Sequence, residues 1–212
     1  MTGAVIAEGK AFPPAPRRSG GGSVVERVAL DQREVQRMGG RRAKHPAAAV
    51  VEMLLRPLKP SCVLETTYGE GRFYLVFRPP YLVGVDVERR EWRVRPDEFY
   101  EMPVWSFYRA LREGRVRLGR RPEVVVCDPP WGHPQRRAHY ARGEAWGTPR
   151  LIVDYSVRVA ELLGAGWLLL HYREAPELPG FEAAKVVEFR PFTRYLNAER
   201  TVTYFALYRR RG

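Results

Sequence analysis

The chain has 212 residues, of which 45% are hydrophobic and 28% charged, and its formal net charge is +12. This length fits one domain with a full core, and the lack of any run of about 18 apolar residues argues against a membrane span. The positive charge favours a polyanionic partner, most simply nucleic acid. Arginine-rich surfaces and scarce asparagine, here only Asn197, also fit a protein from a thermophile.

The first 23 residues hold Pro13, Pro14, Pro16 and the glycine run 20–22, a composition that cannot pack a core. They show no charged-then-apolar signal pattern, so we expect a cytoplasmic protein. Residues 24–38 predict a short helix, which the segment 39–44 ends. We therefore expect residues 1–44 to be a flexible or loosely docked basic arm and residues 45–212 to be the main domain.

Short apolar runs alternate with helical patterns through the rest of the chain. The runs at 62–65, 81–86, 123–128 and 166–172 predict parallel strands that are buried on both faces. Helices are predicted at 46–58, 103–114 and 148–166. Residues 184–192 and 200–210 alternate without a helix between them, which predicts an antiparallel pair at one edge. The fold class is α/β, a doubly wound Rossmann-like sheet that is mostly parallel.

Acidic residues end three of the predicted strands, namely Glu65, Asp86 and Asp128. In a doubly wound sheet, ligands bind outside these carboxyl ends. Gly69 and Gly71 allow a tight turn after Glu65 and a close approach of a ligand to the backbone. Asp86 follows Glu65 by about the spacing at which an acid reaches a ribose hydroxyl. No third glycine completes a dinucleotide fingerprint, so an adenosine-bearing cofactor without a pyrophosphate fits better.

The stretch VVVCDPPWG at 124–132 runs a buried strand into Asp128, Pro129, Pro130 and Trp131. It resembles motif IV, the [D/N]-PP-[Y/F/W] signature, of class I S-adenosylmethionine-dependent N-methyltransferases that act on exocyclic amines of nucleic-acid bases. The glycine loop ETTYGEG at 65–71 is similar to motif I of that superfamily, and Asp86 to its motif II acid. KHPA at 44–47 is similar to a preceding motif. The resemblance extends from about residue 45 to the C-terminus.

This resemblance implies S-adenosylmethionine as the cofactor and assigns a role to each matching residue. The residues implied to hold the cofactor are Glu65, Gly69, Gly71 and Asp86, with His45 and Tyr68 as further candidates. Asp128 and the carbonyl of Pro129 would each accept one N–H of the target amine and so point its lone pair at the methyl group. The prolines Pro129 and Pro130 fix φ near −65°, and Trp131 offers a face for an extruded base.

Residues 132–147 interleave basic and aromatic side chains, which is typical of surfaces that neutralise phosphates and stack on bases. The candidates for nucleic-acid binding are Arg136, Arg137, Tyr140 and Arg142. A solvated loop with one packed aromatic residue is the alternative. Only about 16 residues separate Trp131 from Thr148, too few for a target-recognition domain, which favours a structured RNA or a protein partner that supplies recognition.

The sequence therefore predicts an enzyme that methylates adenine N6 or guanine N2 in RNA. Thr66 stands where DNA-modifying relatives usually have proline, which argues against DNA as the substrate. A protein-glutamine or DNA-adenine methyltransferase and a non-catalytic RNA-binding module remain as alternatives, although protein-amide enzymes typically carry Asn where Asp128 stands. The histidines and cysteines lack metal-ligand spacing, so we expect no metal.

Overall fold

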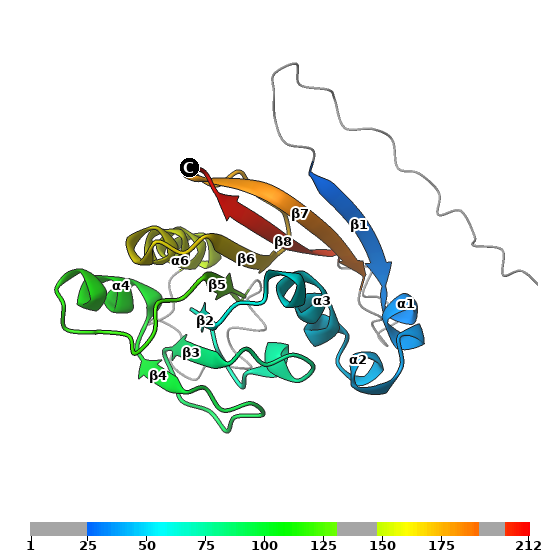
Figure 1. Cartoon of the computed structure of the whole chain (residues 1–212), viewed down its shortest axis with the longest axis horizontal. Helices are drawn as coiled ribbons and strands as arrows, with labels where there is room; N and C mark the ends of the chain where they lie inside the picture. The colour runs from blue at the N-terminus through cyan, green and yellow to red at the C-terminus, as the bar shows by residue number, and fades with distance from the viewer. Residues whose placement is uncertain (1–24, 131–147, 191–201) are drawn as a thin grey trace, which may run out of the picture.

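The computed structural model describes residues 25–130, 148–190 and 202–212 (Figure 1). One eight-stranded sheet forms its centre, with the strand order β1-β7-β8-β6-β5-β2-β3-β4. The strands are β1 (Glu26–Asp31), β2 (Cys62–Glu65), β3 (Tyr81–Asp86), β4 (Glu98–Glu101), β5 (Val124–Cys127), β6 (Trp167–Tyr172), β7 (Phe181–Arg190) and β8 (Thr203–Arg210). In this sheet β8 is antiparallel to both of its neighbours, β6 and β7, whereas the other pairings are parallel.

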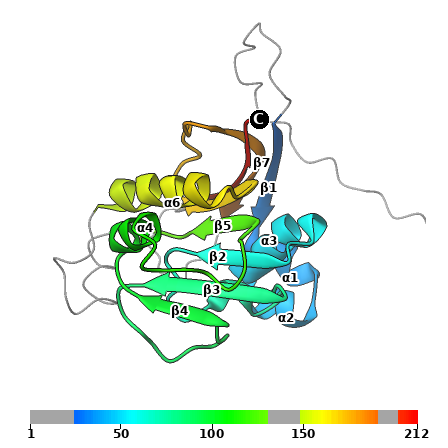
Figure 2. The ribbon, with the colours of Figure 1, turned by 60° about the vertical axis from the view of Figure 1, so that its left-hand side comes forward.

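Helices cover both faces of this sheet (Figure 2). They are α1 (Gln32–Arg37), α2 (Gly40–Lys44), α3 (Pro46–Leu55), α4 (Val104–Arg112) and α6 (Pro149–Leu163), with short 3-10 turns at Arg56–Leu58 and Arg72–Tyr74. Along β2, Cys62 and Leu64 pack in the core beneath α4 and α6, while Val63 packs beneath α3. Burial on both faces explains the continuous apolar runs, and the predicted doubly wound α/β sheet is confirmed. Among the described residues, no helix is long and apolar enough to cross a membrane.

The chain reverses its winding between β2 and β5, because β3 and β4 continue on one side and β6 on the other. A crevice at such a switch point, outside the carboxyl ends of the strands, is where ligands bind in open α/β sheets. Glu65 pairs in register with Val126, so Asp128 lies just beyond it at the same edge. The sheet topology therefore brings two of the three predicted acids together.

The predicted helix over residues 24–38 is wrong in its first half. Residues 26–31 form β1, which pairs in parallel with β7, and the helix α1 starts only at Gln32. Asp31 begins it with a capping box: its carboxylate accepts the Glu34 N–H at 2.7 Å, and the Glu34 carboxylate accepts the Asp31 N–H at 2.6 Å. The residues 25–44, assigned to an arm from the sequence, thus join the sheet through β1.

Two further features differ from the prediction. The antiparallel strands do not form the edge of the sheet, because β8 inserts between β6 and β7 and β1 covers β7. The edge strand β4 was not predicted at all. It has only four residues, and with Glu98 and Glu101 at its ends the two aromatic residues between them are too short a run to predict a strand. Its importance is that it positions the segment that follows it, which lines the candidate site.

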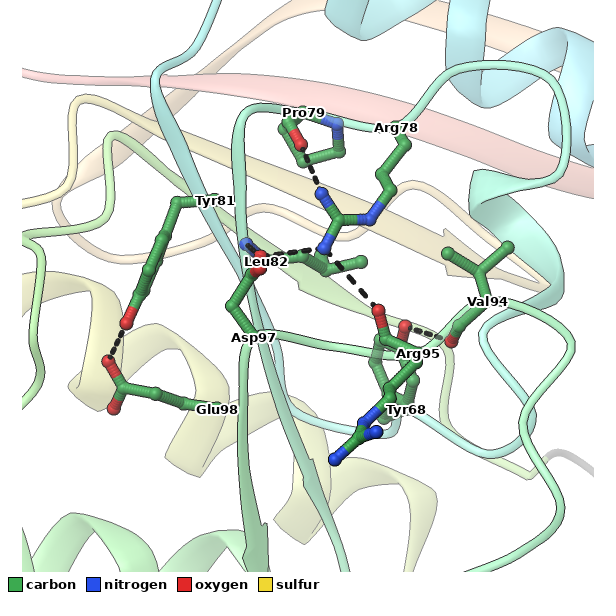
Figure 3. Close-up of polar contacts among 9 residues, drawn as sticks. All are labelled: Tyr68, Arg78, Pro79, Tyr81, Leu82, Val94, Arg95, Asp97 and Glu98. Carbon is green, nitrogen blue, oxygen red and sulfur yellow. Dashed lines mark hydrogen bonds and ion pairs between the residues drawn. The ribbon is translucent and has the colours of Figure 1, made fainter.

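The turn after β2 rests on the buried ring of Tyr68. This ring lies over Gly84 of β3, where a Cβ atom would come within 2.8 Å of the Tyr68 Cγ atom. The Tyr68 hydroxyl donates to the Val94 carbonyl at 2.7 Å (Figure 3). In the same segment, the Asp97 carboxylate accepts hydrogen bonds from the Leu82 N–H and from Arg78, both at 2.8 Å (Figure 3). The loops after β2 and β3 are thereby tied to each other.

We predict that Gly84→Ala lowers the free energy of unfolding by about 1–3 kcal/mol, because the added methyl group forces the Tyr68 ring out of place. Urea denaturation measures the change. Gly166→Ala is the matched control, since no atom lies within 4 Å of its added Cβ, and it should change stability by less than about 0.5 kcal/mol. Equal stability of the two variants would show that Tyr68 does not depend on the space at Gly84.

Candidate active site

A cavity of about 520 Å³ lies at the carboxyl end of the sheet, around the switch point between β2 and β5. Its wall carries acidic, hydroxyl and imidazole groups from several strands and loops. The polar residues that matter here are Glu65, Thr67, Asp128 and His171, with Lys44 and His45 at one side. A cavity with a few convergent polar groups at this position in the fold is the expected form of an active site.

The predicted glycine loop has the backbone conformation that requires glycine. Gly69 and Gly71 have φ angles of +56° and +75°. A Cβ at Gly71 would lie 2.6 Å from both the Tyr68 hydroxyl and the Val94 carbonyl oxygen, so this glycine makes room for the protein itself. No atom lies within 4 Å of the corresponding position at Gly69, which lines the cavity. The backbone at Gly69 is therefore open to a ligand.

Asp86 lies behind this loop, with only 3% of its surface exposed. Its carboxylate accepts the N–H of Gly69 at 2.7 Å, and burial raises its pKa. The residue also lines a second, narrow recess next to the cavity, together with Thr67, Val87, Met102 and Pro103. The sequence reasoning missed Met102 and Pro103, because both follow the unpredicted strand β4.

Glu65 is as deeply buried as Asp86, with 3% of its surface exposed. Its Oε2 atom has no hydrogen-bond partner among the described residues. Burial, together with the nearby charge of Asp128, raises the pKa of Glu65 well above its usual value. The Tyr74 hydroxyl also acts on this carboxyl group, and a buried carboxyl oxygen without a hydrogen-bond partner favours either a bound proton or a cationic ligand beside it.

Asp128 follows β5 and faces the cavity, with 35% of its side chain exposed. Its backbone N–H donates to the Thr67 hydroxyl at 2.7 Å, and its Oδ1 atom lies 3.0 Å from Nδ1 of His171. Pro129 is buried and Pro130 partly buried. The start of the predicted motif IV therefore has a fixed position just beyond β5. Asp128 is bonded to Thr67 in the loop after β2 on one side and contacts His171 in β6 on the other.

His171 is the main residue of this site that sequence reasoning missed. Its Nε2 atom lies 3.1 Å from the Thr203 hydroxyl, and its ring stacks on Phe205 at 3.9 Å between centroids. The register Cys127↔Leu170 places His171 directly beside Asp128. The signal was present in the sequence, because the histidine lies near the end of one predicted strand and the acid ends another. For His171, only metal-ligand spacing was considered, so this pair was missed.

The remaining predicted site residues divide into two groups. His45, between α2 and α3, and Tyr68 both line the cavity, although the Tyr68 hydroxyl is engaged by Val94 and supports the loop. The others lie outside the described residues, so their predicted roles stay predictions: Trp131, Arg136, Arg137, Tyr140 and Arg142.

Comparison with known proteins gives a likeness in structure only. No family model and no curated protein sequence matches the chain. The N-methyltransferase NodS from Bradyrhizobium japonicum WM9, solved with S-adenosyl-L-homocysteine, is similar in fold, with a TM-score of 0.50 and 9% identity over 80% of this chain and 88% of NodS. PH1948 from Pyrococcus horikoshii, described as a proposed RNA methyltransferase, gives a TM-score of 0.48 and 13% identity over 77% of this chain and 83% of that one. The chain has the Rossmann-like fold of class I methyltransferases.

We predict that Glu65→Gln stabilises the ligand-free protein at pH 8 by about 1 kcal/mol or more and has little effect at pH 4. The folded pKa of Glu65 is raised, so the charged carboxyl costs stability once the pH exceeds its unfolded pKa, and the amide removes this cost. Urea denaturation at both pH values measures the difference. Glu177→Gln, at an exposed position, is the control that should show no such pH dependence. A loss of stability at pH 8 would contradict the assignment.

Proposed function

We propose that the protein is an S-adenosylmethionine-dependent N-methyltransferase that acts on an exocyclic amine of a base in RNA, either adenine N6 or guanine N2. The observation that supports this most strongly is the position of Asp128. Its carboxylate lies in the same cavity as Glu65 and Gly69, at the switch point of a methyltransferase-type sheet. A target amine bound by Asp128 would thus be next to the cofactor residues.

The residues of the site suit S-adenosylmethionine. The unpartnered Glu65 oxygen suits the ammonium group of its methionine part, and Asp86 suits the ribose hydroxyls. The recess beside Val87 and Met102 is mostly apolar, which suits an adenine ring, and its volume of about 20 Å³ means that its walls would have to move apart to admit one. When bound, this cofactor supplies a methyl group activated by a positively charged sulfur.

Asp128 has the geometry to prepare a poor nucleophile. The lone pair of an exocyclic amine is delocalised into the base, and it becomes available when both N–H groups are held out of the ring plane. His171 engages Oδ1 of Asp128, so Oδ2 remains to accept one N–H, and the Pro129 carbonyl can accept the other. Methyl transfer would replace the carbon–sulfur bond of the cofactor with a bond to this nitrogen, and Asp128 would take one N–H proton. Alignment of this kind contributes most of the rate.

RNA is favoured over protein as the substrate by charge and by motif chemistry. A net charge of +12 suits a phosphate backbone. Methyltransferases that act on protein amides typically carry Asn where this chain has Asp128. A shape-recognised RNA, or recognition supplied by a protein partner, would explain how such a short chain selects its target.

We predict that Asp128→Ala reduces methyl transfer at least about 100-fold and leaves cofactor binding unchanged, because the variant loses the amine acceptor but keeps the cofactor residues. Transfer of labelled methyl to RNA from the source cells measures the first effect, and calorimetry with S-adenosylhomocysteine the second. Asp154→Ala, at a partly exposed acid on α6, is the control. Labelling of duplex DNA alone, or of protein in a nuclease-treated extract, would contradict RNA as the substrate.

We predict that His171→Ala lowers kcat about 10- to 100-fold, because a hydrogen bond to a charged group is worth about 1.5–3 kcal/mol. His171→Asn should restore most of the activity, since its amide N–H can replace the Nδ1–H that holds Asp128. Single-turnover kinetics at saturating cofactor and RNA compares the two variants. If His171→Asn is as slow as His171→Ala, this bond does not orient Asp128.

A further inference from the structure

Residues 26–44, which form β1, α1 and α2, place two basic helices at the carboxyl end of the sheet, where the cavity opens. The strand β1 is parallel to β7, and β7 runs in the same direction as β6, since both are antiparallel to β8. The carboxyl end of β1 therefore lies at the same edge as Asp128 and His171. The helices α1 and α2 follow it directly and lie beside α3 (Figure 1).

An ion pair between Arg42 and Glu52 fixes α2 against α3. The Arg42 guanidinium donates two hydrogen bonds to the Glu52 carboxylate, at 2.7 and 2.8 Å, and Arg56 binds the same carboxylate. Glu52 has 3% of its surface exposed, and the hydrogen bonds from Arg42 keep its pKa below the usual value. Because Glu52 stays charged at neutral pH, α2 has a fixed position.

Arg41 and Lys44, on the same short helix, have no acidic partner among the described residues. Both are exposed, and their spacing of three residues places them on neighbouring turns of one side. The acids before them in the chain, Asp31 and Glu34, hold the capping box of α1, and Glu52 pairs with Arg42 and Arg56. Lys44 also lines the cavity that contains Asp128. Two exposed cations thus lead from Arg41 to the margin of the cavity.

We propose that Arg41 and Lys44 bind the phosphodiester backbone of the nucleic acid whose target base enters the cavity. An extruded base brings with it the phosphates on either side of its own nucleotide, so cations are needed at the rim of the cavity. A small amine substrate would need no cations there. The identity of the substrate rests on the proposed function, but the contact with phosphates does not depend on methyl transfer.

The test is the salt dependence of RNA binding by the variant Arg41→Gln/Lys44→Gln. Fluorescence anisotropy with a labelled single-stranded RNA of mixed sequence gives the Kd between about 50 and 300 mM salt. The loss of two phosphate contacts should weaken binding about tenfold at low salt and reduce the slope of log Kd against log salt by about 1.4. Binding of S-adenosylhomocysteine should not change.

The control is Lys59→Gln/Arg117→Gln, one lysine and one arginine that are exposed and precede β2 and β5 at the opposite edge of the sheet. Wild-type binding by Arg41→Gln/Lys44→Gln, or an equal loss in the control, would overturn the proposal. The slope should change equally on single-stranded DNA, and a change on RNA alone would contradict a phosphate contact. If the wild type binds RNA in this way but transfers no methyl group, the proposed function is wrong, whereas the phosphate contact of Arg41 and Lys44 is supported.

Discussion

The geometry of the site depends on how the Asp128 segment is held. The Asp128 backbone is hydrogen-bonded to Thr67 after β2, and its carboxylate contacts His171 in β6. These contacts exist because β5 lies between β2 and β6, so that three segments distant in the sequence meet at one edge. The stacking of His171 on Phe205 of β8 extends this support to the antiparallel strand. The sheet as a whole therefore fixes the orientation of one carboxylate.

The charges of the site are segregated by depth. Glu65, Asp86 and Asp128 lie in or beside the cavity, and the first two are almost fully buried. Arg41 and Lys44 are exposed, on a helix held by a separate ion pair, and Lys44 lies at the margin of the cavity. This arrangement suits a cationic ligand within the cavity and a polyanionic ligand across its rim. A sulfonium cofactor and a nucleic-acid substrate have these opposite charges.

Patterns that depend on local chain geometry, including the antiparallel pairing of β7 and β8, could be predicted from the sequence, whereas strand order and register could not. The central parallel strands β2, β3, β5 and β6 were predicted because burial on both faces leaves continuous apolar runs. The acids Glu65, Asp86 and Asp128 were then found at the ends of three of these runs. The role of His171 depends on the register between β5 and β6, which no local pattern encodes. The strand β1 was missed because it is an edge strand with only partial burial, so its charged residues resemble those of a surface helix.

The central claim is that cofactor and target amine meet between the glycine loop and Asp128. A crystal structure with bound S-adenosylhomocysteine tests it most directly. The account predicts ribose hydroxyls at Asp86, the amino group at Glu65 and the sulfur facing the Asp128 carboxylate. Density for the ligand away from Gly69, or an Asp128 side chain turned away from the sulfur, would contradict it.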